Sequence, residues 1–143
     1  MRAKHVAILM RGWSAEREVS LASGKACAGA LEGRGYRVTP TDVGRDIASV
    51  LAALRPDAAL NVLHGRPGED GALQGILEVL AIPYSHSGVL ASAPAMQKDV
   101  AKVMVAAGNI PVPEGRVSLF ASRLKSGLLL ARRRAALQVL RAA

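Results

Sequence analysis

Three residues near the start of one predicted helix have the types and the spacing to bind a small amino acid. Glu16, Val19 and Ser20 stand at positions i, i+3 and i+4, so they share one face of a helix. The carboxylate could bind an ammonium group, the valine could contact a methyl group, and the serine could form a hydrogen bond or orient the glutamate. An ordinary capped helix with solvated acids explains the same spacing, so both interpretations stay open at this point.

A histidine at the head of a glycine-rich loop is the second candidate. His64 directly follows the apolar run of residues 58–63 and precedes the loop GRPGEDG. Glycines permit close backbone approach and positive φ, and the imidazole could donate to a carboxylate or to developing negative charge. A structural histidine at a strand end is an equal alternative. Glu69 and Asp70 could instead tie the loop together or cap the following helix.

A lysine on a later predicted helix is the third candidate. Lys98, with Lys102 one turn further on, could meet a phosphate as a point charge, although most helical lysines are simply solvated. The chain contains neither the G-x-x-x-x-G-K-[ST] phosphate loop, nor G-x-S-x-G, nor H-E-x-x-H. Cys27, His64 and His86 lack the spacing of a zinc site, so we expect no bound metal.

The elements that must position these residues alternate between strand and helix. Short apolar or β-branched runs predict strands at residues 5–10, 36–39 and 58–63. Residues 82–85 predict a further short strand or sheet edge. Helical spacing predicts four helices: residues 14–33 or 14–35 with Ser14 as N-cap, 47–54, 73–80 and 100–107. In the first helix, Ala22, Ala26 and Ala30 form a small-residue stripe that we expect to pack on the sheet.

Strand and helix in this order predict an α/β fold, with a parallel sheet flanked by helices and right-handed crossovers. Ligands of such sheets gather at the carboxyl ends of the strands. The loops expected there are residues 11–16, 64–70 and 85–88, which include the glutamate and the histidine.

The formal net charge of +8 is concentrated at one end of the chain. Residues 1–115 hold 12 basic and 11 acidic residues, whereas residues 116–143 hold seven basic residues and no acid. We therefore expect one domain over residues 1–115 and a basic, helical tail over residues 116–143. Binding of nucleic acid or an anionic membrane through the tail is the weakest functional alternative, because basic composition without stacking aromatics is a poor signal.

Neither a disulfide nor a membrane span is expected. Cys27 is the only cysteine, so no intramolecular disulfide can form, and this fits a reducing, cytoplasmic setting. No apolar run approaches the roughly 18 residues that a transmembrane helix needs.

Three longer segments, taken in order, closely resemble the bacterial D-alanine:D-alanine ligases. They are residues 12–21 (GWSAEREVSL), residues 63–75 and residues 82–92, and the resemblance extends over about residues 4–115. It implies a Rossmann-like pre-ATP-grasp domain. It also implies a cytoplasmic, often homodimeric, ATP- and Mg²⁺-dependent ligase. Such a ligase activates one D-alanine as an acyl phosphate and joins a second to make the dipeptide of peptidoglycan.

The resemblance also assigns roles to individual residues. Glu16 would bind the ammonium group of the first D-alanine, with Val19 and Ser20 beside it. His64 would lie near the carboxylate of that substrate and the reacting centre, which makes Glu16 and His64 the expected catalytic residues. Lys98 would reach an ATP phosphate.

The sequence departs from the family pattern in three places. Arg11 stands where the family has a glycine, and Gln97 replaces the usual aspartate before the lysine. Residues 116–143 do not resemble the family, whose central and carboxyl-terminal ATP-grasp segments are missing. Since those segments supply most adenine contacts and the Mg²⁺ ligands, we expect this chain alone to be inactive. A non-catalytic module that binds D-alanine or a partner is the alternative.

Overall fold

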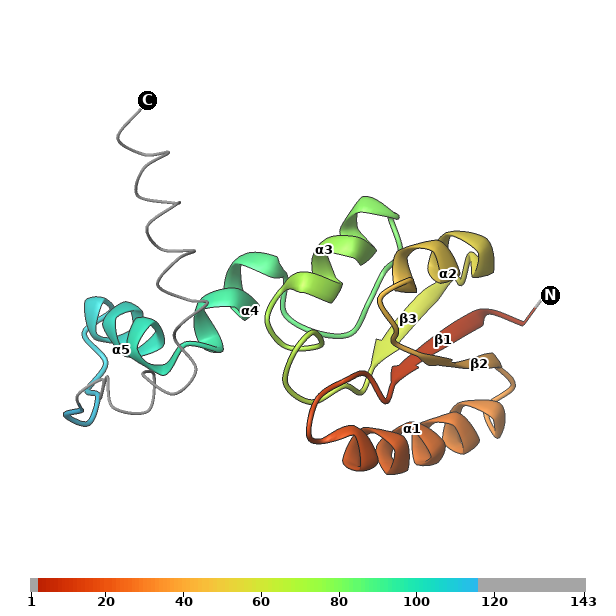
Figure 1. The fold of residues 1–143 in the computed structure, drawn as a ribbon, viewed down its shortest axis with the longest axis horizontal. Coiled ribbons are helices and arrows are strands. Elements are labelled where there is room, and N and C mark those ends of the chain that lie inside the picture. The colour runs from red at the N-terminus through yellow and green to blue at the C-terminus, as the bar shows by residue number, and fades with distance from the viewer. Residues whose placement is uncertain (1–2, 116–143) are drawn as a thin grey trace. The chain divides into compact units, whose positions relative to one another are not determined.

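Residues 3–115 are described by the computed structural model of the chain, and they divide into two units between Ala101 and Lys102. The first unit has the predicted α/β architecture, with three parallel strands in the order β2-β1-β3 (Figure 1). The elements are β1 (His5–Met10), α1 (Arg17–Glu32), β2 (Arg37–Asp42), α2 (Ile47–Leu54), β3 (Ala58–Asn61), α3 (Ala72–Val79), α4 (Val89–Ala95) and α5 (Lys98–Ala107), which spans the division.

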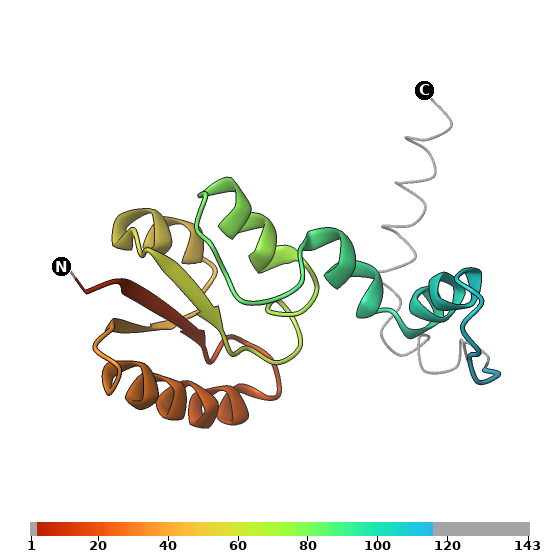
Figure 2. The same cartoon turned by 180° about the vertical axis from the view of Figure 1, so that it is seen from behind.

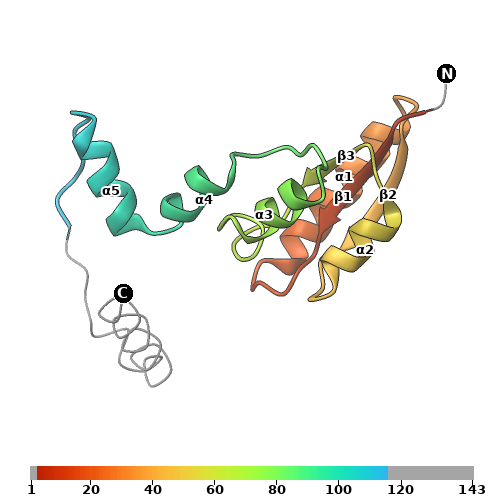
Figure 3. The same ribbon diagram turned by 90° about the horizontal axis from the view of Figure 1, so that it is seen from above.

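The central strand β1 is apolar because it is covered on both faces. Ala7, Ile8 and Leu9 are completely buried, as expected for a parallel strand between helical layers. Figure 3 shows α1 behind the sheet and α2 in front of it. The main apolar cluster joins alternate residues of β1 to α2 and α3: Ala7, Leu9, Val43, Ile47, Leu51, Ala59, Leu63, Leu73, Leu77 and Ile82.

Helix α1 packs on the sheet through a different face from the one predicted. Its buried residues are Ser20 and Gly24, whereas Ala22, Ala26 and Ala30 are exposed. A β-carbon at Gly24 would lie 2.6 Å from Met10 Cε, so the helix packs closely on β1 there. The prediction of an alanine stripe against the sheet was wrong, because alanine is accepted equally well on either face of a helix.

The start of α1 also differs from the prediction. The helix begins at Arg17 with Glu16 as N-cap, and Ser14 Oγ instead accepts the amide of Glu16 at 3.2 Å. A hydroxyl that binds the amide two residues on forms a local turn, which competes with helix capping. Glu16 therefore lies at the junction of loop and helix.

A short fourth segment extends the sheet beyond β3. The amide of Ala59 donates to Pro83 O at 2.8 Å, and the amide of Ser85 donates to Ala59 O at 3.1 Å. Ala59 and Tyr84 form an isolated parallel bridge, which confirms the predicted strand or edge at residues 82–85. Helix α4 was not predicted, because Pro94 lies within it.

In the described part of the second unit, Lys102 Nζ donates to Pro113 O at 2.8 Å. Helix α5 has no buried residue, and Val103 and Met104 of its predicted apolar stripe are 71% and 54% exposed. Among residues 3–115 no helix is both long and apolar enough to cross a membrane. The predicted basic helix at residues 116–143 lies outside the described residues, so the domain boundary after residue 115 stays a prediction.

Candidate functional site

The loops that follow β1 and β3 lie at one end of the sheet, as Figures 1 and 2 show. The chain runs from β1 to β2 on one side and returns to β3 on the other, so the strand order reverses between β1 and β3. Open parallel sheets bind ligands at such a reversal, outside the carboxyl ends of the strands. Residues 11–16 and 62–71 therefore border the candidate site.

Glu16 and the residue after His64 meet at this reversal. A β-carbon built at Gly65 would lie 3.5 Å from Glu16 Oε2 and 3.7 Å from Ser14 Cβ. Glu16 is exposed and His64 is half-buried. The fold thus brings the loop of the predicted glutamate against the loop of the predicted histidine, leaving a carboxylate open to a ligand.

The loop that carries His64 is tied together by its own acidic side chains. The amide of Gly65 donates to Glu69 Oε2 at 2.6 Å, and the amide of Glu69 donates back to Gly65 O at 3.0 Å. Asp70 Oδ1 accepts the amide of Ala72 at the start of α3, at 3.1 Å. The interpretation in which the acids tie the loop together is confirmed for Glu69. Asp70 forms a local turn before α3, whose N-cap is Gly71 without a side-chain capping bond.

Two buried amides that the sequence reasoning did not single out hold the other side of this loop. Asn61 Nδ2 and Gln74 Nε2 both donate to Gly68 O, at 2.8 and 2.7 Å. Asn61 Oδ1 also accepts the amide of Leu63. A polar residue at the end of an apolar strand and another inside an apolar helix pattern were the available signals, since buried polar groups need partners.

Ser20 faces the interior of the fold. Its side chain is 0% exposed, and its hydroxyl donates to Val62 O at 2.7 Å and accepts the amide of Arg11 at 2.8 Å. The hydroxyl thereby joins α1 to the ends of both β1 and β3. Val19, predicted to lie beside the same substrate, is 54% exposed.

On the other side of the first loop, Asp42 at the end of β2 pairs with two arginines. Arg17 donates to both carboxylate oxygens of Asp42, at 3.2 and 3.0 Å, and Arg11 Nη1 lies 3.6 Å from Asp42 Oδ2. The hydrogen bond from Arg17 lowers the pKa of the Asp42 carboxyl below its usual value, although burial acts in the opposite direction. The same bond raises the pKa of Arg17. Arg11 adopts φ +68°, which a glycine would adopt without strain.

Lys98, the predicted phosphate ligand, is exposed at the first position of α5. Within residues 3–115, no group of three or more His, Cys, Asp and Glu side chains is arranged to hold a metal ion.

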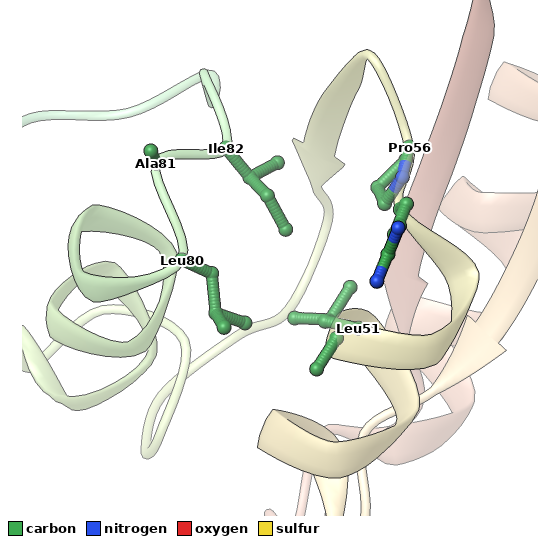
Figure 4. Close-up of a pocket in the computed structure, with 7 residues that line it drawn as sticks. Leu51, Pro56, Leu80, Ala81 and Ile82 are labelled. Atoms are coloured by element: carbon green, nitrogen blue, oxygen red, sulfur yellow. The ribbon is translucent and has the colours of Figure 1, made fainter.

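A separate pocket of about 320 Å³ opens at the other end of the sheet. Figure 4 shows Leu51 and Pro56 on one side of it and Leu80, Ala81 and Ile82 on the other. These residues end α2 or precede β3 and the bridge segment, so the pocket lies near the amino end of β3. The loops of Glu16 and His64 do not contribute to it.

The sequence is similar to proteins named D-alanine–D-alanine ligase. It is 65% identical over 127 residues to the one from Xanthobacter autotrophicus and 72% identical over 113 residues to the one from Methylocella silvestris. These alignments cover 89% and 79% of this chain, but 42% and 37% of the relatives. The chain thus spans about two fifths of the length of these relatives. No protein-family model matches it.

Solved structures agree with this similarity. A Bacillus anthracis D-alanine–D-alanine ligase complexed with ATP superposes with a TM-score of 0.71 and 32% identity, covering 88% of this chain and 45% of that one. The D-alanine–D-alanine ligase of Aeromonas hydrophila has a TM-score of 0.65 and 27% identity, covering 90% of this chain and 56% of that one. In sequence and in fold, the described residues are therefore similar to the amino-terminal domain of the D-alanine–D-alanine ligases.

Proposed function

We propose that the chain supplies one wall of the D-alanine site of a D-alanine–D-alanine ligase. The observation that carries this proposal is the position of the Glu16 carboxylate, exposed and next to Gly65, at the reversal of strand order between β1 and β3. An exposed carboxylate at such a crevice can pair with the ammonium group of a small amino acid.

The neighbouring residues then have distinct roles. Glu16 binds the ammonium group of the first D-alanine, and the exposed Val19 contacts its methyl group. His64 donates to the carboxylate of that substrate near the reacting centre. Ser20 acts indirectly, because its hydroxyl proton is already given to Val62 O and its side chain is buried. Its role is to hold the two loops at a fixed separation.

Most of the protein ligands of ATP and Mg²⁺ would come from residues outside 3–115. ATP provides the phosphate that activates one D-alanine as an acyl phosphate in this proposal. Lys98 is the one residue we assign to it, as a point charge for a phosphate. The described residues contain no cluster that could hold a metal ion, so they do not fit Mg²⁺. Phosphoryl transfer requires that charge neutralisation, so we propose that this chain alone does not turn over.

The wider setting follows from the same proposal. The dipeptide product serves peptidoglycan synthesis, and the protein works in the cytoplasm. A homodimer is the expected assembly. The tests of D-alanine binding do not depend on the pathway, the cellular location or the oligomeric state.

A non-catalytic module that binds D-alanine is the second candidate. One observation supports it, namely that the residues described by the structure contain no cluster that could hold a metal ion. ADP release that depends on D-alanine separates the two functions. We expect none from the chain alone and measurable release when a polypeptide matching the remaining three fifths of a relative is added. Release that stays absent after this addition would favour the binding module.

Titration of the labelled chain with D-alanine, followed by nuclear magnetic resonance, tests the binding site itself. We expect D-alanine to shift the amides of residues 12–16 and 64–66, and L-alanine to shift them less. Glu16→Gln should abolish these shifts, because the amide cannot pair with an ammonium group as a carboxylate does. Glu18→Gln is the matched control, since it removes the same charge two residues away. Equal shifts in the Glu16→Gln and Glu18→Gln variants would exclude the proposed role of Glu16.

A further inference from the structure

We infer that Asp42, at the end of β2, is a positioning residue that clamps the loop of Glu16 through Arg17. The clamp consists of Asp42, Arg17, Arg11 and the carbonyl of Gly12. Its importance for D-alanine rests on the proposed function, whereas its effect on the loop is a separate property of the fold. None of these residues was assigned a role in binding or catalysis above.

The guanidinium group of Arg17 is the centre of the clamp. It donates to Asp42 Oδ1 at 3.2 Å and Oδ2 at 3.0 Å, and Nη1 also donates to Gly12 O at 3.1 Å. A fork of this kind fixes direction as well as distance, because two parallel hydrogen bonds cannot both persist if either side rotates. One side chain thus joins the end of β2 to the backbone of the substrate loop.

Arg17 is also the residue directly after Glu16. Helix α1 begins at Arg17, and no side chain caps its amino terminus. The ion pair with Asp42 therefore supports the helix start at the position where Glu16 leaves the loop. A change in the direction of the Arg17 side chain would be transmitted to Glu16 through a single peptide bond.

Arg11 adds a second cation on the same carboxylate. Its Nη1 lies 3.6 Å from Asp42 Oδ2, and its backbone is held at φ +68°, next to Gly12 at φ +67°. A left-handed conformation is costly for a residue with a β-carbon, so it persists where surrounding contacts hold it. The pair with Asp42 and the hydrogen bond from the Arg11 amide to Ser20 are two such contacts.

A further contact from the segment after β2 reaches the middle of the same loop. Arg45 Cζ lies 4.3 Å from the centroid of the Trp13 ring, a cation–π arrangement. The substrate loop is therefore held from the β2 side at Arg11, Trp13 and Arg17. On its other side Glu16 approaches Gly65. The end of β2 thus sets how closely Glu16 approaches the loop after β3.

Trp13 is the single tryptophan of the chain and lies within the clamped loop, so its fluorescence reports on the loop directly. We expect Asp42→Asn and Arg17→Lys to increase quenching of Trp13 by acrylamide. The dissociation constant for D-alanine should rise by about threefold, which is the scale of an exposed, well-oriented ion pair. Asp42→Glu keeps the carboxylate and should recover part of both effects.

Glu32→Gln is the control, because it removes an exposed carboxylate at the far end of the same helix. It should change neither quenching nor affinity. Thermal melting establishes that each variant is folded at the temperature of the measurement. If Asp42→Asn does not fold, Arg17→Lys alone tests the clamp. This variant retains the positive charge and loses only the paired hydrogen bonds to the Asp42 carboxylate.

The possible outcomes separate the clamp from the proposed function. Wild-type quenching in both Asp42→Asn and Arg17→Lys would overturn the clamp. Increased quenching with unchanged affinity for D-alanine would overturn its positioning role. If the wild-type chain binds no D-alanine, the proposed function fails, and the quenching comparison alone decides whether the clamp orders the loop.

Discussion

The carboxylate of Glu16 lies against the backbone of Gly65, with Oε2 3.5 Å from the position that a β-carbon would take there. The two residues belong to the loops that follow β1 and β3, which are neighbours in the sheet. Gly65 adopts φ +68°, which glycine takes without strain, and a β-carbon there would be in van der Waals contact with Glu16. The size of the space beside Glu16 therefore depends on the lack of a side chain at Gly65 in the neighbouring loop.

Gly65→Ala should weaken D-alanine binding as well as stability. We expect a loss of about 1–2 kcal/mol from the positive φ, while the added methyl group narrows the space beside Glu16. Gly35→Ala is the matched control, because Gly35 has φ +83° and nothing within 4 Å of its β-carbon position. Urea unfolding should show similar losses in both variants, and only Gly65→Ala should bind D-alanine more weakly. Equal affinities would mean that Gly65 does not border the site.

Gly68→Ala should destabilise the loop of His64 by about 1–3 kcal/mol, the usual cost of overpacking. A β-carbon there would lie 2.3 Å from Leu63 Cβ, too close for any rotation of that side chain to relieve. The carbonyl of Gly68 also accepts from Asn61 and Gln74. Thermal melting measures the effect. Gly29→Ala provides the contrast, because this helical position is open and alanine should stabilise it by up to about 1 kcal/mol. An unchanged melting temperature for Gly68→Ala would contradict the packing of this loop.

Ser20→Ala should cost about 1–3 kcal/mol of stability, because Val62 O and the amide of Arg11 would each lose a hydrogen-bond partner in the interior. Ser49→Ala, at an exposed position of α2, should change stability by less than about 0.5 kcal/mol. Urea unfolding of the two variants compares these values. Equal stability of the two variants would mean that the Ser20 hydroxyl does not join the strand ends.

The fold could be predicted from local patterns wherever burial was uniform along an element. The run of residues 5–10 had to be a covered strand, and the apolar spacing of α3 fixed its buried face. Local patterns failed where two local preferences competed. Ser14 could cap a helix or form a turn, and the turn formed. Strand β2 continues through Pro40 because it lies at the edge of the sheet, where a missing amide is tolerated.

The features of the candidate site that depend on the strand arrangement alone could be predicted from the sequence. The ends of adjacent parallel strands had to bring the loops of Glu16 and His64 together. The supports of these loops were not predictable, because they pair residues that are distant in sequence without any characteristic spacing. Asp42 with Arg17 is one such pair, and Gly68 with Leu63 is a contact that only the folded backbone creates.

Acid should release the loop of Glu16 through Asp42. The hydrogen bond from Arg17, with the nearby charge of Arg11, holds the pKa of the Asp42 carboxyl below its usual value near 3.9. A carboxyl with a lowered native pKa contributes stability that is fully present above its unfolded pKa and is lost as the pH falls through the native value. The clamp therefore contributes fully at neutral pH. Its contribution is lost only as the pH falls below the usual carboxyl value near 3.9 and through the lower native value, since both arginines stay charged. Trp13 quenching, measured from neutral pH down into the acid range below the usual carboxyl value near 3.9, should rise in the wild-type chain as Asp42 becomes protonated. Asp42→Asn should start from a higher value and lack this rise, so the difference between the two curves separates Asp42 from the other carboxyl groups. Parallel curves would show that protonation of Asp42 does not free the loop.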